Sequence, residues 1–239
     1  MTSTLVVGAT GATGSILIEN LLSVGHEVQA IVRSPDKFSS VVINNPNMKI
    51  VEANILDLTD DELAKQVERC DAVVSCLGHV LSFSGMFGHP RALCTEATRR
   101  LCNAIEANTP SKPTKFILMN TVGVPNPELN ENRQWFERVL LKTLHYTIPP
   151  HRDNETAAEH LMSNVGKHNR SVEWCSVRPD SLINAEVSPY EISNSPITGV
   201  FTGRPTSRAN VANFMMELIE DAILWDTWKF KMPVITNSK

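Results

Sequence analysis

The sequence predicts an α/β fold: one domain over residues 1–239, built on a doubly wound parallel sheet with helices on both faces. Short apolar runs rich in β-branched residues alternate along the chain with segments of helical periodicity, the order typical of repeated β-α-β units. These runs are apolar at nearly every position, as are strands that a parallel sheet buries on both faces. No Gly/Ser-rich linker or run of like charges divides the chain.

The elements follow in a regular order. Strands are predicted over residues 4–7, 28–32, 49–53, 71–77, 115–120, 172–177 and 232–236. Helical spacing is present over 12–22, 60–70, 91–108, 154–168 and 207–225, with helix starts expected at Thr59 or Asp60, at Pro90, and at Asp153 or Asn154. The C-terminal part, about 179–239, is expected to contribute a substrate-side loop, beginning at Arg178 and Pro179, and a closing helix.

Three glycines follow the first strand at intervals of three: Gly8, Gly11 and Gly14. Gly8 suits a turn with positive φ, Gly11 lets a pyrophosphate approach the backbone, and Gly14 allows the helix to pack closely on the strand. The helix N-terminus adds free N–H groups and a partial positive charge. No Lys-Ser/Thr follows, so the pattern is not an ATP-binding loop. It predicts a dinucleotide site, with a ligand-free glycine turn as the alternative.

Arg33 follows the second strand and lies 19 residues after Gly14. NAD enzymes carry Asp or Glu about 20 residues past the glycines, where the carboxylate accepts from the ribose 2′-hydroxyl. Arginine cannot accept that bond, but its fork of donors can hold a 2′-phosphate. The cofactor predicted from this residue is NADP(H), with Ser34 and Lys37 as possible assistants.

The composition limits the classes of partner that the protein is expected to bind. The net charge is −4 and the isoelectric point is near 6.0, which argues against a nucleic-acid-binding surface. No apolar run approaches membrane-spanning length and no secretory signal is evident. The five cysteines form no C-x-x-C pair, so neither a disulfide framework nor a metal site is expected. A cytoplasmic monomer or homodimer acting on a small molecule is the expectation.

Five segments resemble, in order, the atypical short-chain dehydrogenase/reductases of the NmrA-like and biliverdin IXβ/flavin reductase type. They are GATGATG (8–14), VRSPDK (32–37), NTVGV (120–124), DNETAAEHL (153–161) and WCSVRP (174–179). The resemblance implies a Rossmann-type sheet, bound NADP and hydride transfer, but no particular substrate. It puts Thr10, Gly11, Ala12 and Thr13 at the pyrophosphate, Arg33 and Ser34 at the 2′-phosphate, Asn54 and Ile55 at adenine, and Cys76, Leu77, Gly78, Asn120 and Thr121 at the nicotinamide side.

The usual proton donor of the larger group is missing. Short-chain dehydrogenases pair a tyrosine with a lysine four residues later, but Tyr146 is followed at that distance by Pro150. Tyr146 lies 25 residues after Thr121, a spacing compatible with extended members, yet the Ile-Pro-Pro sequence is expected to break any helix there. No catalytic residue is assigned, and Thr121, Tyr146 and His151 remain weak candidates.

These observations predict hydride transfer from NADPH to a small conjugated or flavin-like acceptor, without a Tyr-Lys pair. Phe83 and Phe87, in a Gly-containing loop, are candidates for stacking a flat acceptor. Water or a neighbouring side chain would supply the proton. The alternatives are a non-catalytic NADP(H)-responsive regulator of the NmrA-like kind, and an isomerase or epimerase of a modified sugar or terpenoid. Arg99 and Arg100 are expected on a solvated helix face.

Overall fold

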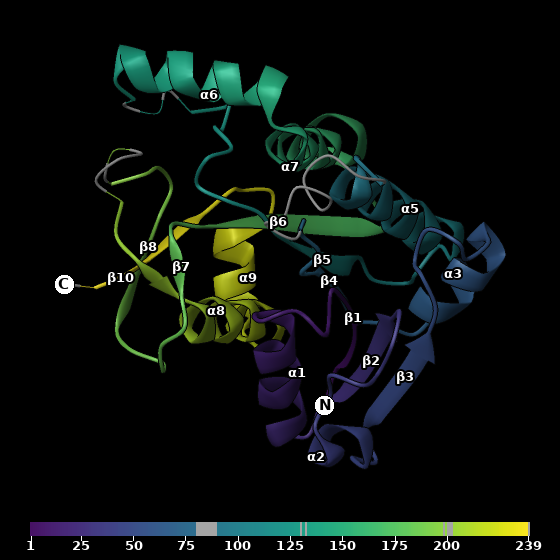
Figure 1. Cartoon of the computed structure of the whole chain (residues 1–239). Coiled ribbons are helices and arrows are strands. Elements are labelled where there is room, and N and C mark those ends of the chain that lie inside the picture. Colours follow the sequence, from purple (N-terminus) through teal and green to yellow (C-terminus); the bar gives the residue numbers. More distant parts are fainter. Residues whose placement is uncertain (80–89, 130, 132, 198, 200–202, 239) are drawn as a thin grey trace.

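An eight-stranded sheet forms the centre of the computed structural model, which describes residues 1–79, 90–129, 131, 133–197, 199 and 203–238 (Figure 1). The strand order is β3-β2-β1-β4-β5-β6-β10-β8, and all neighbours are parallel except the β10–β8 pair. The predicted doubly wound α/β fold is therefore confirmed. The strands are β1 (Ser3–Val7), β2 (Glu27–Val32), β3 (Met48–Glu52), β4 (Ala72–Ser75), β5 (Thr114–Met119), β6 (Val172–Pro179), β8 (Tyr190–Ser193) and β10 (Val234–Asn237). Two short strands, β7 (Leu182–Ile183) and β9 (Thr206–Ser207), form a separate parallel pair.

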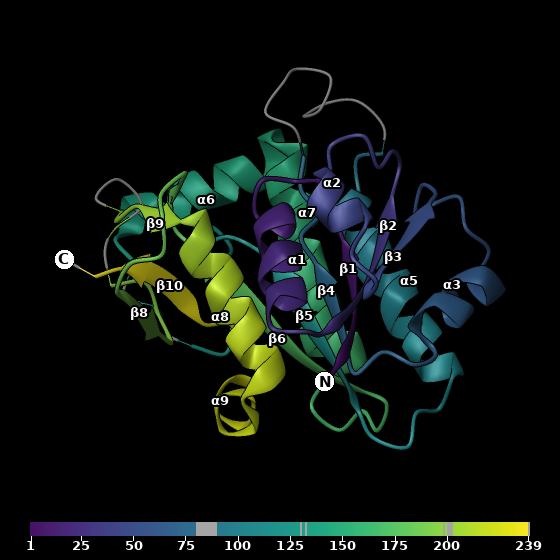
Figure 2. The same cartoon turned by 90° about the horizontal axis from the view of Figure 1, so that it is seen from below.

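Helices cover both faces of the sheet (Figure 2). One face packs against α1 (Gly14–Ser23), α2 (Ser40–Ile43), α8 (Arg208–Glu220) and α9 (Ala222–Trp228). The other packs against α3 (Asp60–Val67), α5 (Leu93–Ala107), α7 (Pro149–Glu159) and the π-helix η1 (His160–Val165). Each face has its own buried apolar cluster, because the side chains of a strand alternate between the two sides. No helix in the described part of the chain is long and apolar enough to cross a membrane.

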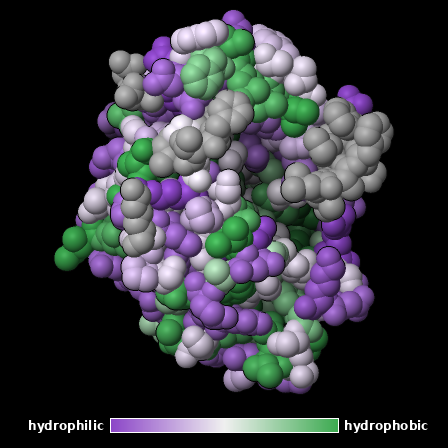
Figure 3. All heavy atoms as spheres, turned by 60° about the vertical axis from the view of Figure 1, so that its left-hand side comes forward, coloured by the Kyte–Doolittle hydropathy of each residue, from purple (hydrophilic) through white to green (hydrophobic). Residues whose placement is uncertain are grey.

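Helix α6 (Trp135–Thr147), which was not predicted, lies against α7 at the edge of the molecule. Its side chains Trp135, Phe136, Val139 and Tyr146 are exposed. Apolar side chains are visible at the upper end of this side of the molecule, where α6 lies (Figure 3). The helix ends at Thr147, and after Ile148 the next one begins with Pro149.

Three predicted helix boundaries are wrong. The helix expected to start at Pro90 starts at Leu93. The helix expected to start at Asp153 or Asn154 starts at Pro149, because proline has no N–H to lose and fits the first turn of a helix. The last predicted helix is divided at Asp221, whose carboxylate accepts from the N–H groups of Ile223 and Leu224 and so starts a new helix. The start at Thr59 is confirmed: it forms a reciprocal capping box with Glu62.

Arg178 was expected, with Pro179, to begin a substrate-side loop, but it lies inside β6. Its side chain is fully buried in β6, where the guanidinium donates to the carbonyls of Met232, Val124 and Asn194 and to the carboxylate of Glu131 at 2.6 Å. Glu131 is itself buried and also accepts from Arg133. One cation thus ties β6 to three loop segments. Its role is structural, at the end of the sheet formed by β6, β10 and β8.

We predict that Arg178→Met lowers the free energy of unfolding by about 3 kcal/mol or more. Methionine has a similar volume but leaves a buried carboxylate and three carbonyls without their donor. The measurement is urea denaturation, with Arg69→Met, an exposed arginine at the end of α3, as the matched control. A loss no larger than that of the control would contradict the role assigned to this network.

Candidate functional site

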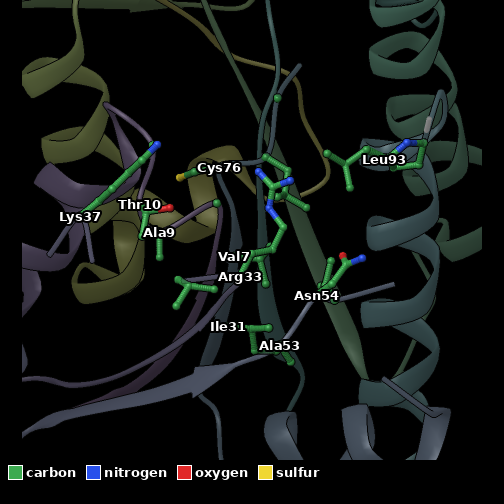
Figure 4. Close-up of a pocket in the computed structure, with 17 residues that line it drawn as sticks. Val7, Ala9, Thr10, Ile31, Arg33, Lys37, Ala53, Asn54, Cys76 and Leu93 are labelled. Atoms are coloured by element: carbon green, nitrogen blue, oxygen red, sulfur yellow. The ribbon is translucent and has the colours of Figure 1, made fainter. Parts of the chain in front are cut away.

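A pocket lies at the carboxyl ends of β1, β2, β3 and β4, the position where doubly wound sheets bind ligands (Figure 4). The segment after each of these strands contributes to its wall. Of the residues predicted to bind the cofactor, those that line the pocket are Gly8, Thr10, Gly11, Arg33, Asn54, Ile55, Cys76, Leu77 and Gly78. Ala12, Thr13, Gly14, Ser34, Asn120 and Thr121 do not line it.

The glycine turn is built on close backbone contacts. Gly8 has a φ of +72°, and a Cβ on it would lie 2.4 Å from the carbonyl carbon of Cys76, so the turn after β1 presses directly on the end of β4. A Cβ on Gly14 would lie 2.4 Å from Gly8 O, so α1 starts tightly against the same turn. Gly11 is exposed and its N–H donates to Gly8 O. Only glycine fits at Gly8 and Gly14, while Gly11 leaves the backbone open to a ligand.

Thr13 does not take the role expected of it in this turn. It was expected to offer its hydroxyl to the phosphates, with capping of the turn as the alternative. The side chain is instead buried and makes no cap hydrogen bond, although Thr13 occupies the cap position of α1. Ala12 is exposed beside it but lies outside the pocket wall.

Two cations stand at the end of β2. Arg33 and Lys37 both line the pocket and are exposed, and the side chain of Arg33 extends into it (Figure 4). Within the described ranges, neither residue makes a hydrogen bond or ion pair. Ser34, expected to assist Arg33, instead donates to the carboxylate of Asp36 at 2.7 Å and does not line the pocket. The positive charge at this end is therefore available to a ligand.

Arg100 was expected on a solvated helix face, and that is wrong. Its side chain is 10% exposed and donates from α5 to the carbonyls of Ile55, Leu56 and Leu58 and to the carboxylate of Asp60. These carbonyls belong to the loop after β3, which carries Asn54 and Ile55 into the pocket. Arg100 thus fixes one wall of the pocket. Its charge was visible in the sequence, but carbonyl partners more than 40 residues away leave no local pattern.

The wall after β4 is formed by Cys76, Leu77 and Gly78. Burial raises the pKa of the Cys76 thiol to about 12, so the group stays a neutral thiol at physiological pH. Cys76 is therefore an apolar wall residue and not a nucleophile. The loop with Phe83 and Phe87 lies outside the described residues.

Asn120 and Thr121 follow β5 but support a helix instead of lining the pocket. The side chain of Asn120 donates to the carbonyl of Asn154 in α7 and accepts from the N–H of Thr121. The hydroxyl of Thr121 accepts from the N–H of Gly123. Because β4 and β5 are adjacent, with Ser75 opposite Leu118, both segments leave the same edge of the sheet. The two residues thus lie beside the pocket wall.

Tyr146 lies on α6 with 75% of its surface exposed, and it does not line the pocket after β1 to β4. Its ring packs edge-on against His145, and it borders two shallow hollows between α6 and α7. Tyr146 is inside α6, and that helix ends one residue later, at the Ile-Pro-Pro sequence, as expected.

An anchor that the sequence did not reveal joins three segments beside the pocket. The buried carboxylate of Asp153 in α7 accepts from His79 Nε2 at 2.8 Å and from the backbone N–H groups of Cys94 and Thr95. The start of α5 has no side-chain cap of its own, so Asp153 caps it from another helix. His79, Cys94 and Asp153 bring their side-chain ligand atoms within 4.8 Å of one another, but the carboxylate is already saturated by these donors. Burial beside Asp153 raises the pKa of Cys94 well above its usual value, so it is a thiol.

Comparisons with known proteins agree with this geometry. A family model described as NAD(P)H-binding matches residues 8–222. The divinyl chlorophyllide a 8-vinyl-reductase of Cucumis sativus, described as chloroplastic, is 28% identical over 239 residues. That alignment covers 93% of this chain and 51% of the cucumber protein, so the chain spans about half the length of that relative.

Solved structures share the fold. A short-chain dehydrogenase/reductase of Veillonella parvula in complex with NADP superposes with a TM-score of 0.70 at 15% identity, covering 99% of this chain and 94% of that one. A candidate NADH-flavin reductase of Streptococcus pneumoniae gives 0.66 at 16% identity, with both chains fully covered. At these identities the likeness extends to the fold. The predicted cytoplasmic location stays a prediction.

We predict that Arg100→Gln lowers the free energy of unfolding by about 2 kcal/mol, because hydrogen bonds from a charged donor to buried carbonyls are among the stronger ones. Arg99→Gln, at the next position, is the matched control: it removes only an exposed ion pair with Glu96 and should cost less than about 0.5 kcal/mol. Hydrogen exchange of residues 55–58 should accelerate only in Arg100→Gln. Equal effects of the two variants would contradict the role given to Arg100.

Proposed function

The chain belongs to the NAD(P)H-binding family, and from this premise we propose that it is an NADPH-dependent reductase of a small conjugated or flavin-like acceptor. The observation that carries the choice of cofactor is the charge of the pocket. Among the described residues that line it, Arg33 and Lys37 are cations and none is acidic. An NAD site needs a carboxylate for the 2′-hydroxyl, whereas a 2′-phosphate is matched by these two cations.

The remaining contacts are assigned from the same geometry. The open backbone at Gly11 and the N-terminal end of α1 fit a pyrophosphate. Asn54 and Ile55, held by Arg100, would border the adenine, and Leu77 with Gly78 the nicotinamide side. The residues present therefore fit a dinucleotide lying across the ends of β2, β1 and β4.

When bound, NADPH supplies a hydride from its nicotinamide ring. The chain's own part is to hold that ring and an electron-poor acceptor in contact and to exclude water from between them. The neutral, buried Cys76 thiol and Leu77 give this wall an apolar surface. An acceptor with a conjugated ring suits such a site, because it can take the hydride directly. We place this reaction in a single cytoplasmic domain.

A non-catalytic NADPH-responsive regulator is the second candidate function. It is favoured by the position of Tyr146, which leaves no tyrosine among the described residues of the pocket wall. NADPH oxidation measured against a panel of flavins, quinones and tetrapyrroles separates the two. Turnover with any member supports the reductase, while tight NADPH binding with no turnover supports the regulator.

We predict that NADPH binds more tightly than NADH and that Arg33→Ala weakens NADPH about 10-fold or more. Loss of a charge-assisted hydrogen bond to the 2′-phosphate costs about 1.5–3 kcal/mol, and 1.4 kcal/mol corresponds to a factor of 10. Isothermal titration calorimetry with both cofactors is the measurement, and Arg69→Ala is the control. Equal affinity for the two cofactors, or an unchanged NADPH affinity in Arg33→Ala, would overturn the assignment of NADPH.

We also predict that Tyr146→Phe reduces kcat less than 10-fold. Removing a general acid typically costs 100-fold or more, but this hydroxyl is exposed on α6 and outside the pocket. The measurement is the steady-state rate of wild type and of Tyr146→Phe, with saturating NADPH and the best acceptor of the panel. A loss of about 100-fold at unchanged NADPH affinity would restore Tyr146 as the proton donor.

A further inference from the structure

His151 and the carboxylate of Glu155 form a pair next to the end of β5. His151 is in the first turn of α7, and its side chain is 10% exposed. A methyl group built on Gly123 would lie 3.5 Å from His151 Cε1, 3.7 Å from His151 Nδ1 and 3.6 Å from Thr121 Oγ1. One edge of the imidazole and the hydroxyl of Thr121 therefore border the same small space, directly after β5.

Glu155, one helical turn after His151, faces the opposite edge of the ring. Its Oε1 lies 3.3 Å from the buried Nε2 of His151, and its Oε2 contacts Nδ1 of His145 in α6. Burial alone would raise the pKa of Glu155, but the contacts with His151 and His145 outweigh it and the pKa is lowered. The carboxylate is therefore charged at neutral pH. The angle at Nε2 is poor for a hydrogen bond, which is common for catalytic pairs before substrate binds.

The other ring nitrogen, Nδ1, makes no hydrogen bond within the described part of the chain. A histidine with one nitrogen next to a carboxylate and the other directed to a site is the arrangement that general acids and bases use. The carboxylate orients the ring and stabilises its protonated form.

The anchor at Asp153 ties the helix that carries this ring to the wall of the cofactor pocket, although His151 itself is not among the residues that line it. Asp153 is two residues after His151, and its carboxylate holds His79, which directly follows Gly78 in the pocket wall. The same carboxylate caps α5, while Asn120 holds Asn154 from the other side. These contacts fix the first turns of α7 to the segments after β4 and β5 and to the start of α5. His151 is carried on that turn, beside the wall assigned to the nicotinamide.

We propose that His151 is the proton donor of the reductase, with Glu155 as its positioning residue, for acceptors such as quinones and flavins that need a proton as well as a hydride. The proposal rests on the proposed function. The acceptor gains a hydride from NADPH at one atom, and the Nδ1–H bond of protonated His151 breaks as a proton passes to the atom where negative charge develops. NADPH becomes NADP⁺, the acceptor is reduced by two electrons, and neutral His151 regains a proton from water.

Several charged groups lie on the elements packed around this pair. From α6 they are His145, Arg138 and Lys142, from the preceding loop Arg133, on α7 itself Arg152 and Asp153, and from the loop after β4 His79. Arg133 is paired with Glu131, and His79 with Asp153. Glu155 is the acidic group in direct contact with His151.

The test is kcat as a function of pH, with NADPH and menadione, for wild type, His151→Asn and Glu155→Gln. His151→Asn should lower kcat about 100-fold or more and abolish the decline of kcat at high pH, with the Kd for NADPH within twofold of wild type. In Glu155→Gln the decline of kcat should move to lower pH, because no carboxylate then stabilises the protonated imidazole. His168→Asn, an exposed histidine remote from α7, is the control.

Retention of kcat within threefold in His151→Asn, or an unchanged decline in Glu155→Gln, would overturn the proposal. Wild-type protein that binds NADPH but reduces none of menadione, FMN and biliverdin also overturns it. Failure of wild type to bind NADPH would instead refute the proposed function. If His151→Asn does not fold, Glu155→Gln decides alone: a shifted pH profile of kcat in that variant supports the proposal, and an unchanged one overturns it.

Discussion

The contact between the backbones of Gly8 and Cys76 is the constraint on which the rest of the site depends. There is no room for a side chain between them, so the turn after β1 and the end of β4 form one continuous surface. The start of α1 presses on the same turn through Gly14. The pocket floor is therefore made of main chain, and specificity has to come from the segments around it, which are Arg33 and Lys37 on one side and Leu77 and Gly78 on the other.

Other segments at this end of the sheet are held by charged side chains, whose partners are carbonyls or amides of another element. Arg100 fixes the loop after β3, Asp153 fixes α7 to α5, and Arg178 fixes the loops around β6. Each group is buried or nearly so, and each replaces hydration with several hydrogen bonds of good geometry. The described segments that these groups contact are thus each held by several hydrogen bonds.

The parts of this structure that could be predicted from the sequence are those set by neighbouring residues. The glycine turn, the strands and the capping box at Thr59 all depend on side chains within a few positions of one another. Asp153 could not be read correctly, because the groups it caps are 58 and 59 positions away. The Pro149–Pro150 pair was read as a helix break, and α6 does end before it, but the same pair begins α7 and so brings His151 and Glu155 onto one face. Local sequence shows that a charge is present but not which distant backbone group it meets.

The position of β10 within the sheet has a consequence for how the chain folds. Val234–Asn237 comes after every other described strand in the sequence, yet it lies between β6 and β8 and is the element to which β8 pairs. During synthesis, β8 emerges about 40 residues before the strand that it needs, and its backbone groups have no ladder until then. The β3-to-β6 part can pair in chain order. The sheet should therefore assemble from its nucleotide-binding half, and its far edge should close last, once β10 has left the ribosome.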